Sequence, residues 1–365
     1  MSEAISPSPR GRAGERPVLS IIIPTYNMDK YLRHCLDSLI VPNMDKVEVL
    51  VVNDGSKDSS SAIAHEYQDK YPQTFRVIDK ENGNYGSCIN RALKEITGKY
   101  VKVLDADDSF EKDNFNKYIE LLEKIDADLV LTDYYFVDEE DNITKTYSYA
   151  KLYNIAANKF TNFSEIVQST PSLIIRMHGV TFKATVFDNL QYHQVEGISY
   201  TDTQWCLEPM INVNTVYYEP MVVYRYLFGR AGQTMENQAA HIQDLMTVVC
   251  EMAGFFEQHK LEKNENAHYF INAIEAETKT IYILGLYDKA YSMDKLVPFD
   301  KQLHSHPFFY KDVEPFSYHH AQIIKLWRNN NYHLPVWFPA FKALQKTVHP
   351  FHEFILKSLG KGEQK

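Results

Sequence analysis

The sequence has few cysteines, and they lack the spacing of a metal site. Four occur in 365 residues, and no two form a CxxC pair: Cys35, Cys88, Cys206 and Cys250. Such wide spacing argues against a structural zinc site. Each cysteine lies in an apolar or helical context, so we expect buried free thiols, which fit a reducing compartment.

Long apolar runs and an excess of positive charge are also missing. No run approaches the ~20 apolar residues that cross a bilayer, and the N-terminus lacks the hydrophobic core of a signal peptide. We therefore predict a cytoplasmic protein and leave open a peripheral position at the inner face of the membrane. The formal net charge of −10 argues against general nucleic-acid binding, because phosphate neutralisation needs a basic surface.

The remaining pattern predicts three regions. Residues 1–16 are rich in Ser, Pro, Gly and Arg and are expected to be a disordered tail. Residues 17–235 are expected to form an α/β domain and residues 236–365 a helical domain, because apolar residues recur at helical spacing over much of the chain after about Thr234.

Within the α/β domain, apolar runs typical of buried strands alternate with helical patterns. This alternation predicts a mostly parallel sheet flanked by helices. The Tyr-rich stretch 134–153 has no clear period, and a hairpin within it is left open. Strands are expected at Val18–Pro24, Val47–Asn53, Phe75–Asp79, Tyr100–Leu104 and Ala127–Asp133, and helices at Tyr31–Ile40, Ser59–Tyr71, Gly86–Ile96 and Phe110–Ile125.

Small, polar or acidic residues follow four consecutive predicted strands. In an open parallel sheet, ligands bind at the carboxyl ends of the strands, so these residues are expected to form one composite site. No GxGxxG follows the first strand, which disfavours a dinucleotide dehydrogenase. The segments are Pro24–Asn27, Asn53–Ser56, Asn82–Gly86 and Asp105–Asp108.

The acidic segment is the centre of this predicted site. Extended residues two apart point the same way, so the carboxylates of Asp105 and Asp107 would repel each other unless a cation lies between them. Hard divalent cations prefer oxygen ligands, and a cation that bridges a diphosphate stabilises this leaving group. The alternative is a solvated acidic turn before the following helix.

Two residues of the other strand ends have both a ligand-binding and a structural interpretation. Asp54 can accept a hydrogen bond from a nucleobase or a ribose, but Asp-Gly is also a strong turn dipeptide. Tyr26 can stack on a base or pack against the protein.

Taken together, four segments resemble the successive signatures of family 2 glycosyltransferases. They are IIIPTYN, VEVLVVNDGSKDSS, ENGNYGSCINRAL and GKYVKVLDADDSF, and the resemblance covers about Val18–Arg230. It implies a GT-A fold, transfer with inversion from a nucleotide sugar, and Mn²⁺ or Mg²⁺ as cofactor. It further implies that Asp107 binds the metal and that the nucleotide is held by Pro24, Thr25, Tyr26, Asn27, Asp54, Asn84, Asp105 and Ala106.

Two departures from the family pattern bear on the chemistry. The family often has Glu-Asp in the acceptor region, whereas this chain has Thr201 followed by Asp202. Asp202 is therefore the candidate catalytic base, with a helix cap as the alternative. The third loop carries Tyr85, where the family more often has Gly-Gly followed by a small residue, and Tyr85 is a candidate for donor selectivity.

Three further residues are candidate contacts of the diphosphate or the acceptor. YRYLFGRAGQ resembles the family's closing loop, so Arg225 or Arg230 would meet the diphosphate, or either would be an ordinary surface arginine. His178 in RMHGVTFK resembles a segment under the acceptor site. It would contact the acceptor or a phosphate, or it would be a structural histidine.

These observations predict a metal-dependent hexosyltransferase that moves a sugar, most simply from a UDP-sugar, to an acceptor hydroxyl. The acceptor would be a glycan, a lipid-linked glycan or a glycoprotein in polysaccharide or glycoconjugate synthesis. Two alternatives stay open. Asp105-x-Asp107-x-Ser109 faintly resembles the haloacid-dehalogenase phosphatase motif, although that motif belongs on a first strand. The chain could also be a catalytically inactive module that binds nucleotide or carbohydrate.

The C-terminal segment Val336–Leu359 combines aromatic and basic residues. Such an amphipathic segment suits a membrane surface or a lipid-linked acceptor, and Pro350 would divide it into two helices. The alternatives are that it packs on the catalytic domain or forms a homo-oligomer contact.

Overall fold

The computed structural model describes residues 16–230, 233, 241–287, 293–306 and 318–333. The amphipathic segment Val336–Leu359 and residues 1–15 of the predicted tail lie outside these ranges. The chain divides into two compact units between Ile274 and Glu275, a point inside helix α9 (Ala267–Tyr287). The helix after the sheet, α8 (Ile242–Gln258), therefore groups with the sheet, and the predicted boundary after residue 235 stays a prediction.

Four parallel strands form the first half of the sheet, in the order β3-β2-β1-β4. Their side chains are buried on both faces in β2 and β4 and nearly so in β1, which explains the continuous Val, Ile and Leu runs. The fold prediction is confirmed at these positions, since the strands are β1 (Leu19–Thr25), β2 (Val47–Asn53), β3 (Phe75–Asp79) and β4 (Tyr100–Val103).

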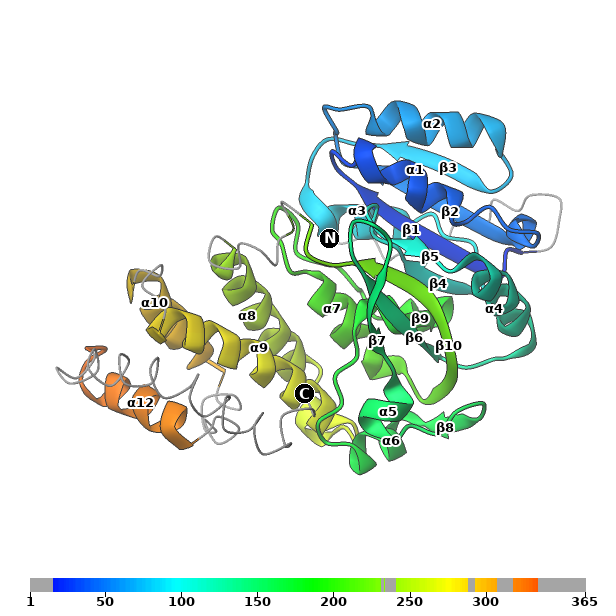
Figure 1. The fold of residues 1–365 in the computed structure, drawn as a ribbon. Coiled ribbons are helices and arrows are strands. Elements are labelled where there is room, and N and C mark those ends of the chain that lie inside the picture. Colours follow the sequence, from blue (N-terminus) through cyan, green and yellow to red (C-terminus); the bar gives the residue numbers. More distant parts are fainter. Residues whose placement is uncertain (1–15, 231–232, 234–240, 288–292, 307–317, 334–365) are drawn as a thin grey trace, which may run out of the picture. The chain divides into compact units, whose positions relative to one another are not determined.

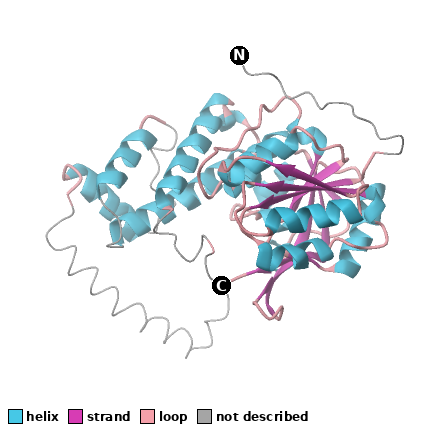
Figure 2. Cartoon of the chain, turned by 90° about the horizontal axis from the view of Figure 1, so that it is seen from above, coloured by secondary structure: helices cyan, strands magenta, loops and turns pink. Residues whose placement is uncertain are grey.

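Helices cover both faces of this half (Figures 1 and 2). On one face, α1 (Asp29–Asp37), α2 (Ser60–Lys70) and α4 (Lys112–Lys124) share a core with alternate residues of β1 and β2. The helix α3 (Asn84–Leu93) packs against the same strands through residues that lie outside that core. This layering is the α/β arrangement that the sequence predicts.

The second half of the sheet is mixed rather than parallel. Strand β9 (Val180–Lys183) runs antiparallel between β4 and β6 (Leu129–Val137). Strand β10 (Thr215–Leu227) is parallel to β6 and also pairs with β5 (Ser109–Phe110). Two outer strands complete the sheet, β7 (Ile143–Tyr147) beside β6 and β8 (Phe160–Asn162) beside β10.

The Tyr-rich stretch contains the hairpin that the sequence left open, because β6 and β7 pair as antiparallel neighbours. The remaining helices of the first unit that matter for the site are α7 (Asp202–Leu207) and the 3-10 turn η2 (Met177–Gly179). The other elements of this unit are η1 (Met44–Lys46), α5 (Tyr149–Tyr153), α6 (Phe163–Ser169), η3 (Ala184–Phe187), η4 (Glu208–Asn212) and η6 (Leu261–Lys263).

The helical C-terminal region is confirmed over the residues that the structure describes. It contains α8, α9, α10 (Met293–Leu303) and α12 (Tyr318–Asn329). Within the second unit, the buried carboxylate of Asp300 accepts hydrogen bonds from Arg328 and Tyr282. Among the described helices, none combines the length and apolar character needed to span a bilayer.

Candidate functional site

The loops that follow β1 and β2 are joined at the carboxyl edge of the sheet. The backbone N–H of Asp54 donates to the carbonyl of Thr25 at 2.8 Å, and that of Lys57 donates to Asn27 Oδ1 at 2.8 Å. Asn27 N–H donates to Ser56 Oγ at 3.1 Å. Two of the predicted loops therefore form one surface.

Asp54 is fully engaged inside this surface. Its carboxylate accepts the backbone N–H groups of Gly83 and Asn84 at 2.9 and 2.8 Å. These groups lie at the first turn of α3, whose N–H groups have no partner within the helix. Lys80 Nζ and Asn82 Nδ2 donate to the same carboxylate at 2.5 and 3.0 Å. Asp54 therefore holds the loop after β3 in place.

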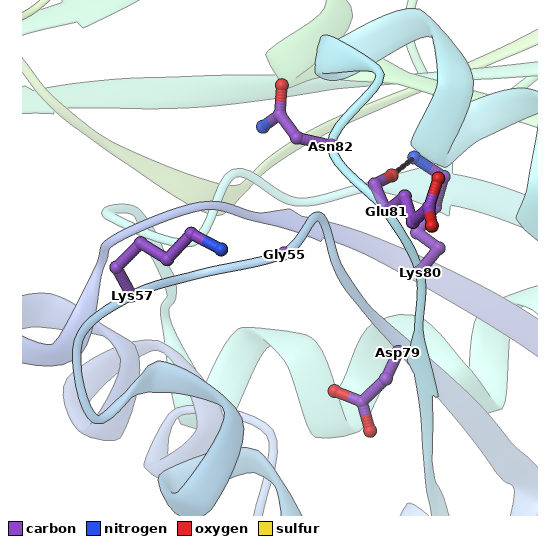
Figure 3. Close-up of a pocket in the computed structure, with 6 residues that line it drawn as sticks. All are labelled: Gly55, Lys57, Asp79, Lys80, Glu81 and Asn82. Atoms are coloured by element: carbon purple, nitrogen blue, oxygen red, sulfur yellow. Dashed lines mark hydrogen bonds between the residues drawn. The ribbon is translucent and has the colours of Figure 1, made fainter.

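A pocket of about 500 Å³ opens between the loops after β2 and β3. Figure 3 shows Gly55 and Lys57 on one loop and Lys80, Glu81 and Asn82 on the other, with Asp79 at the end of β3. Tyr26 at the end of β1 is 45% exposed. These loops supply polar groups and an exposed ring, which suit a nucleoside.

Three aspartates gather at the end of β4. One carboxylate oxygen from each of Asp105, Asp107 and Asp108 lies within 4.8 Å of the others. Asp108 is buried, and both of its oxygens are engaged, by Tyr224 Oη at 2.6 Å and by the N–H of Leu227 at 2.7 Å. Asp108 therefore ties the cluster to β10.

Asp105 and Asp107 each keep one oxygen without a hydrogen bond from the described residues. Tyr85 Oη donates to Asp105 Oδ1 at 3.1 Å, and Arg230 Nε donates to Asp107 Oδ2 at 2.6 Å. The backbone N–H of Asp105 donates to Tyr224 Oη at 3.1 Å. Carboxylates gathered this closely, two of them with an oxygen open to a further ligand, can take a cation.

The electrostatics of the cluster favour such a cation. Burial, followed by the charges of Asp107 and Asp202, raises the pKa of Asp105. Burial and the same cluster raise the pKa of Asp108. Buried like charges disfavour the ionised form, and a cation relieves this repulsion. Oxygen donors of this kind fit Mg²⁺ or Mn²⁺ rather than a thiolate-seeking metal.

Asp202 lies near the acidic cluster, although the two are far apart in the sequence. It is the first residue of α7, whose N-cap is Thr201 with no side-chain capping hydrogen bond. Its charge raises the pKa values of Asp105 and of Tyr85. The three side chains are therefore close enough to interact electrostatically. Burial raises the pKa of Asp202 itself, and the positive charge of Arg176 opposes that shift.

The segment before Asp202 is held against α3. Gly197 N–H donates to the carbonyl of Gly83 at 2.8 Å, while Gln194 exchanges two hydrogen bonds with Asn90. This contact is close because Gly86 has no side chain. A Cβ at Gly86 would lie 2.3 Å from the carbonyl oxygen of Val195.

We expect Gly86→Ala to destabilise the fold, because the clash is with backbone that cannot rotate away. The expected loss is about 1–3 kcal/mol, the usual cost of overpacking a tight contact. Denaturant unfolding of the wild type and the variant measures it. An unchanged unfolding midpoint would show that the 194–197 segment is not packed as described.

The two predicted arginines have different surroundings. Arg230 binds Asp107, and its guanidinium lies over the ring of Tyr31 at 5.2 Å. Arg225 forms ion pairs with Glu111 at 2.7 Å and with Asp141 at 2.8 Å. The structure therefore brings Arg230 to the acidic cluster, whereas Arg225 is engaged elsewhere.

His178 lies in an aromatic environment beneath the cluster. Its ring centroid is 4.2 Å from that of Tyr226 and 5.0 Å from that of Tyr224, and its buried Nδ1 has no hydrogen-bond partner among the residues that the structure describes. Burial and the charges of Lys102 and Arg176 lower its pKa to about 3, so the ring is neutral near pH 7.

Lys102 connects β4 to the segment that carries His178. It is completely buried in β4, and Nζ donates to the carbonyls of His178 at 2.8 Å and Val180 at 3.0 Å. Burial lowers its pKa to about 7. Lys102 thus ties the acidic strand to η2 and β9.

The predicted nucleotide-binding residues differ in exposure. At the strand ends, Thr25 and Ala106 are buried while Pro24 and Asn84 are partly exposed. The sequence alone assigned no individual role to four residues that shape the site. Lys80 binds Asp54, and the other three lie in or around the acidic strand: Lys102, Asp108 and Tyr224. Only Asp108 had a local signal, its place beside Asp107. The others act through partners far along the chain.

Comparison with known proteins agrees with the architecture. The model of the family described as Glycosyl transferase family 2 matches residues 20–180. Glycosyltransferase GlyA of Streptococcus pneumoniae is 30% identical over 179 residues, which cover 48% of this chain and 25% of that protein. This chain therefore spans a quarter of that longer relative.

Other matches extend over more of the chain. Uncharacterized glycosyltransferase RP339 of Rickettsia prowazekii is 28% identical over 290 residues, or 76% of this chain and 85% of the relative. The solved structure of S. aureus TarS 1–349 in complex with UDP has a TM-score of 0.64 at 16% identity and covers 91% of each chain. At that identity the likeness shows the fold.

Proposed function

We propose that the protein transfers a sugar from a nucleotide sugar to an acceptor hydroxyl, because the model of Glycosyl transferase family 2 matches residues 20–180 and the geometry of the site suits this reaction. One observation carries the proposal. The acidic cluster Asp105, Asp107 and Asp108 lies at the carboxyl edge of the sheet, directly after β4, and the charge of Asp202 acts on it.

The loops after β1, β2 and β3 support the donor side of the proposal. Tyr26 offers a half-exposed ring for a base, and Asp54 positions the loop from Lys80 to Asn84. In open α/β sheets this edge is where nucleotides bind. TarS was solved with UDP and with UDP-GlcNAc, which makes UDP the first nucleotide to test.

Asp105 and Asp107 would each offer their free carboxylate oxygen to a Mn²⁺ or Mg²⁺ ion. Such an ion, when bound, neutralises the diphosphate that departs from the sugar. Arg230 is the second positive group at this position. Its guanidinium could release Asp107 and bind a diphosphate oxygen instead, because a guanidinium binds carboxylates and phosphates through the same N–H groups.

Asp202 is proposed as the general base. A carboxylate within hydrogen-bond reach takes the proton of the acceptor hydroxyl as the new bond to the sugar carbon forms. The bond from that carbon to the diphosphate breaks in the same displacement, which inverts the anomeric centre. The proximity of Asp202 to the cluster, seen in the effect of its charge on Asp105 and Tyr85, supports this assignment. Acceptor class, membrane contact and homo-oligomer formation stay predictions.

A screen of donors tests the proposed function. The full chain is incubated with UDP-, GDP- and other nucleotide sugars in Mn²⁺, Mg²⁺ or EDTA, and release of nucleoside diphosphate is measured. We expect slow, metal-dependent hydrolysis of one donor, since water can replace the acceptor. Release of inorganic phosphate from simple phosphoesters would instead favour a phosphatase, and nucleotide binding without turnover would favour an inactive binding module.

A further inference from the structure

Three aromatic rings form a surface at the ends of β6 and β10, here called the aromatic ledge: Phe136, Tyr226 and Phe228. Phe136 and Tyr226 are direct neighbours in the β6–β10 register, with ring centroids 5.4 Å apart. The ring of Phe228 lies 5.7 Å from Phe136 and 5.8 Å from Tyr226. Its N–H donates to the carbonyl of Val137 at 2.9 Å, which keeps Phe228 aligned with the sheet.

The ledge becomes more exposed along its length. Tyr134 and Tyr224, the residues two positions before Phe136 and Tyr226, are buried, whereas Phe136 and Tyr226 are half-buried. Phe228 is 49% exposed. A large ring that stays in water while its neighbours hold its edges is preorganised for a ligand with an apolar face.

The buried end of the ledge borders the acidic cluster. The ring of Tyr226 packs 4.2 Å from His178, and the charges of Asp108, Asp105 and Asp107 add to burial in raising the pKa of Tyr226. At the exposed end, Arg230 follows Phe228 by two residues and binds Asp107. The ledge is thus continuous with the candidate site.

The order of the strands shows that the ledge is separate in space from the predicted nucleoside site. Four steps across the sheet separate β2 from β6, and two separate β4 from β6. Neighbouring strands lie about 4.8 Å apart, so the ledge is roughly 20 Å from the loop after β2 and roughly 10 Å from the cluster. It lies beyond the cluster when viewed from the nucleoside loops.

We propose that the aromatic ledge is the acceptor subsite, where the CH face of a pyranose ring stacks on Phe228 and its hydroxyl is presented to Asp202. This inference rests on the proposed function. A pyranose has an apolar CH face and a rim of hydroxyls, and the ledge matches both. Its apolar part is the ring of Phe228, and its polar rim includes the Tyr226 hydroxyl and Lys145, whose Nζ lies 5.4 Å from the Phe136 ring centroid.

Saturation-transfer NMR on the full chain with UDP and Mg²⁺ tests the acceptor subsite. Aromatic protein protons are irradiated and the signal is read on methyl glycosides of glucose, galactose, mannose and N-acetylglucosamine. The variants are Phe228→Ala and Phe228→Leu, and the second keeps apolar bulk without a ring. The matched control is Phe160→Ala on β8, because Phe160 is 53% exposed and packs on Tyr217 at 5.2 Å.

At least one glycoside should receive saturation from the wild type and from Phe160→Ala. Both Phe228 variants should bind it at least about tenfold more weakly, the scale for truncating an anchoring aromatic, with melting temperatures that show a folded chain. No transfer from the wild type to any glycoside, or transfer that survives in Phe228→Leu, would overturn the inference. Titrations with UDP and with GDP separate the failures: if neither nucleotide binds, the proposed function is at fault.

Discussion

Asp202→Asn should lose at least about 10²-fold in kcat, the usual scale for removing a general base. Asparagine has nearly the same shape and caps a helix about as well as aspartate, so the start of α7 should keep its structure. It cannot accept a proton from the acceptor hydroxyl. The variant should therefore keep its melting temperature and its UDP affinity while transfer, or hydrolysis of the donor by water, is lost.

The pH profile adds a second readout for Asp202. Burial raises the pKa of Asp202 and Arg176 opposes the shift. Because the base acts in its ionised form, kcat of the wild type should rise with pH through this pKa, and the asparagine variant should lack that rise. Glu208→Gln is a matched control, since Glu208 is a buried carboxyl bound to Gln204. Near-normal kcat in Asp202→Asn would return Asp202 to a structural role.

Asp107→Asn should abolish transfer and weaken Mn²⁺ binding by at least about 100-fold, more than is lost when a residue behind a metal ligand is changed. The substitution removes the negative charge beside Asp105 and leaves a neutral amide, which is a poorer ligand for a hard cation. Free Mn²⁺ can be counted by electron paramagnetic resonance in titrations without nucleotide, so this result does not depend on activity.

Asp107→Asn also removes the carboxylate that Arg230 contacts at 2.6 Å. A partly buried charge that loses its partner destabilises the fold, so the melting temperature of the variant must be measured beside its metal affinity. Asp141→Asn is the matched control, because Asp141 pairs with Arg225 away from the cluster. Equal Mn²⁺ affinity in the wild type and Asp107→Asn would remove Asp107 from the metal site.

The first half of the fold is predictable from the sequence because its signals are local. Strands β1 and β2 are nearly or fully buried on both faces, so each reads as an unbroken apolar run, and polar residues mark the point where it ends. Parallel strands bring those ends to one edge. The place of Asp105 and Asp107 directly after β4 is therefore enough to predict that they lie at this edge. The expected reason is wrong, however: the two residues are not extended but lie in a turn, in which the N–H of Asp108 donates to the carbonyl of Asp105 at 3.0 Å.

The rest of the site depends on contacts between distant residues. Arg230 meets Asp107 across 123 positions, and Tyr224 meets Asp108 across 116. No local pattern encodes such pairs. The same limit applies to Asp54, because an Asp-Gly turn does not reveal that the carboxylate fixes the first turn of α3. The antiparallel entry of β9 beside β4 likewise follows from tertiary pairing rather than from its short apolar sequence.

Calorimetric titration of UDP and of GDP into the wild-type chain, in Mn²⁺ and in EDTA, tests most directly the claim that the acidic cluster holds a metal for a nucleoside diphosphate. We expect one of the two nucleotides to bind at least about tenfold more tightly with Mn²⁺, which corresponds to about 1.4 kcal/mol. Equal affinity with and without Mn²⁺ for both nucleotides, or no binding of either, would contradict the account.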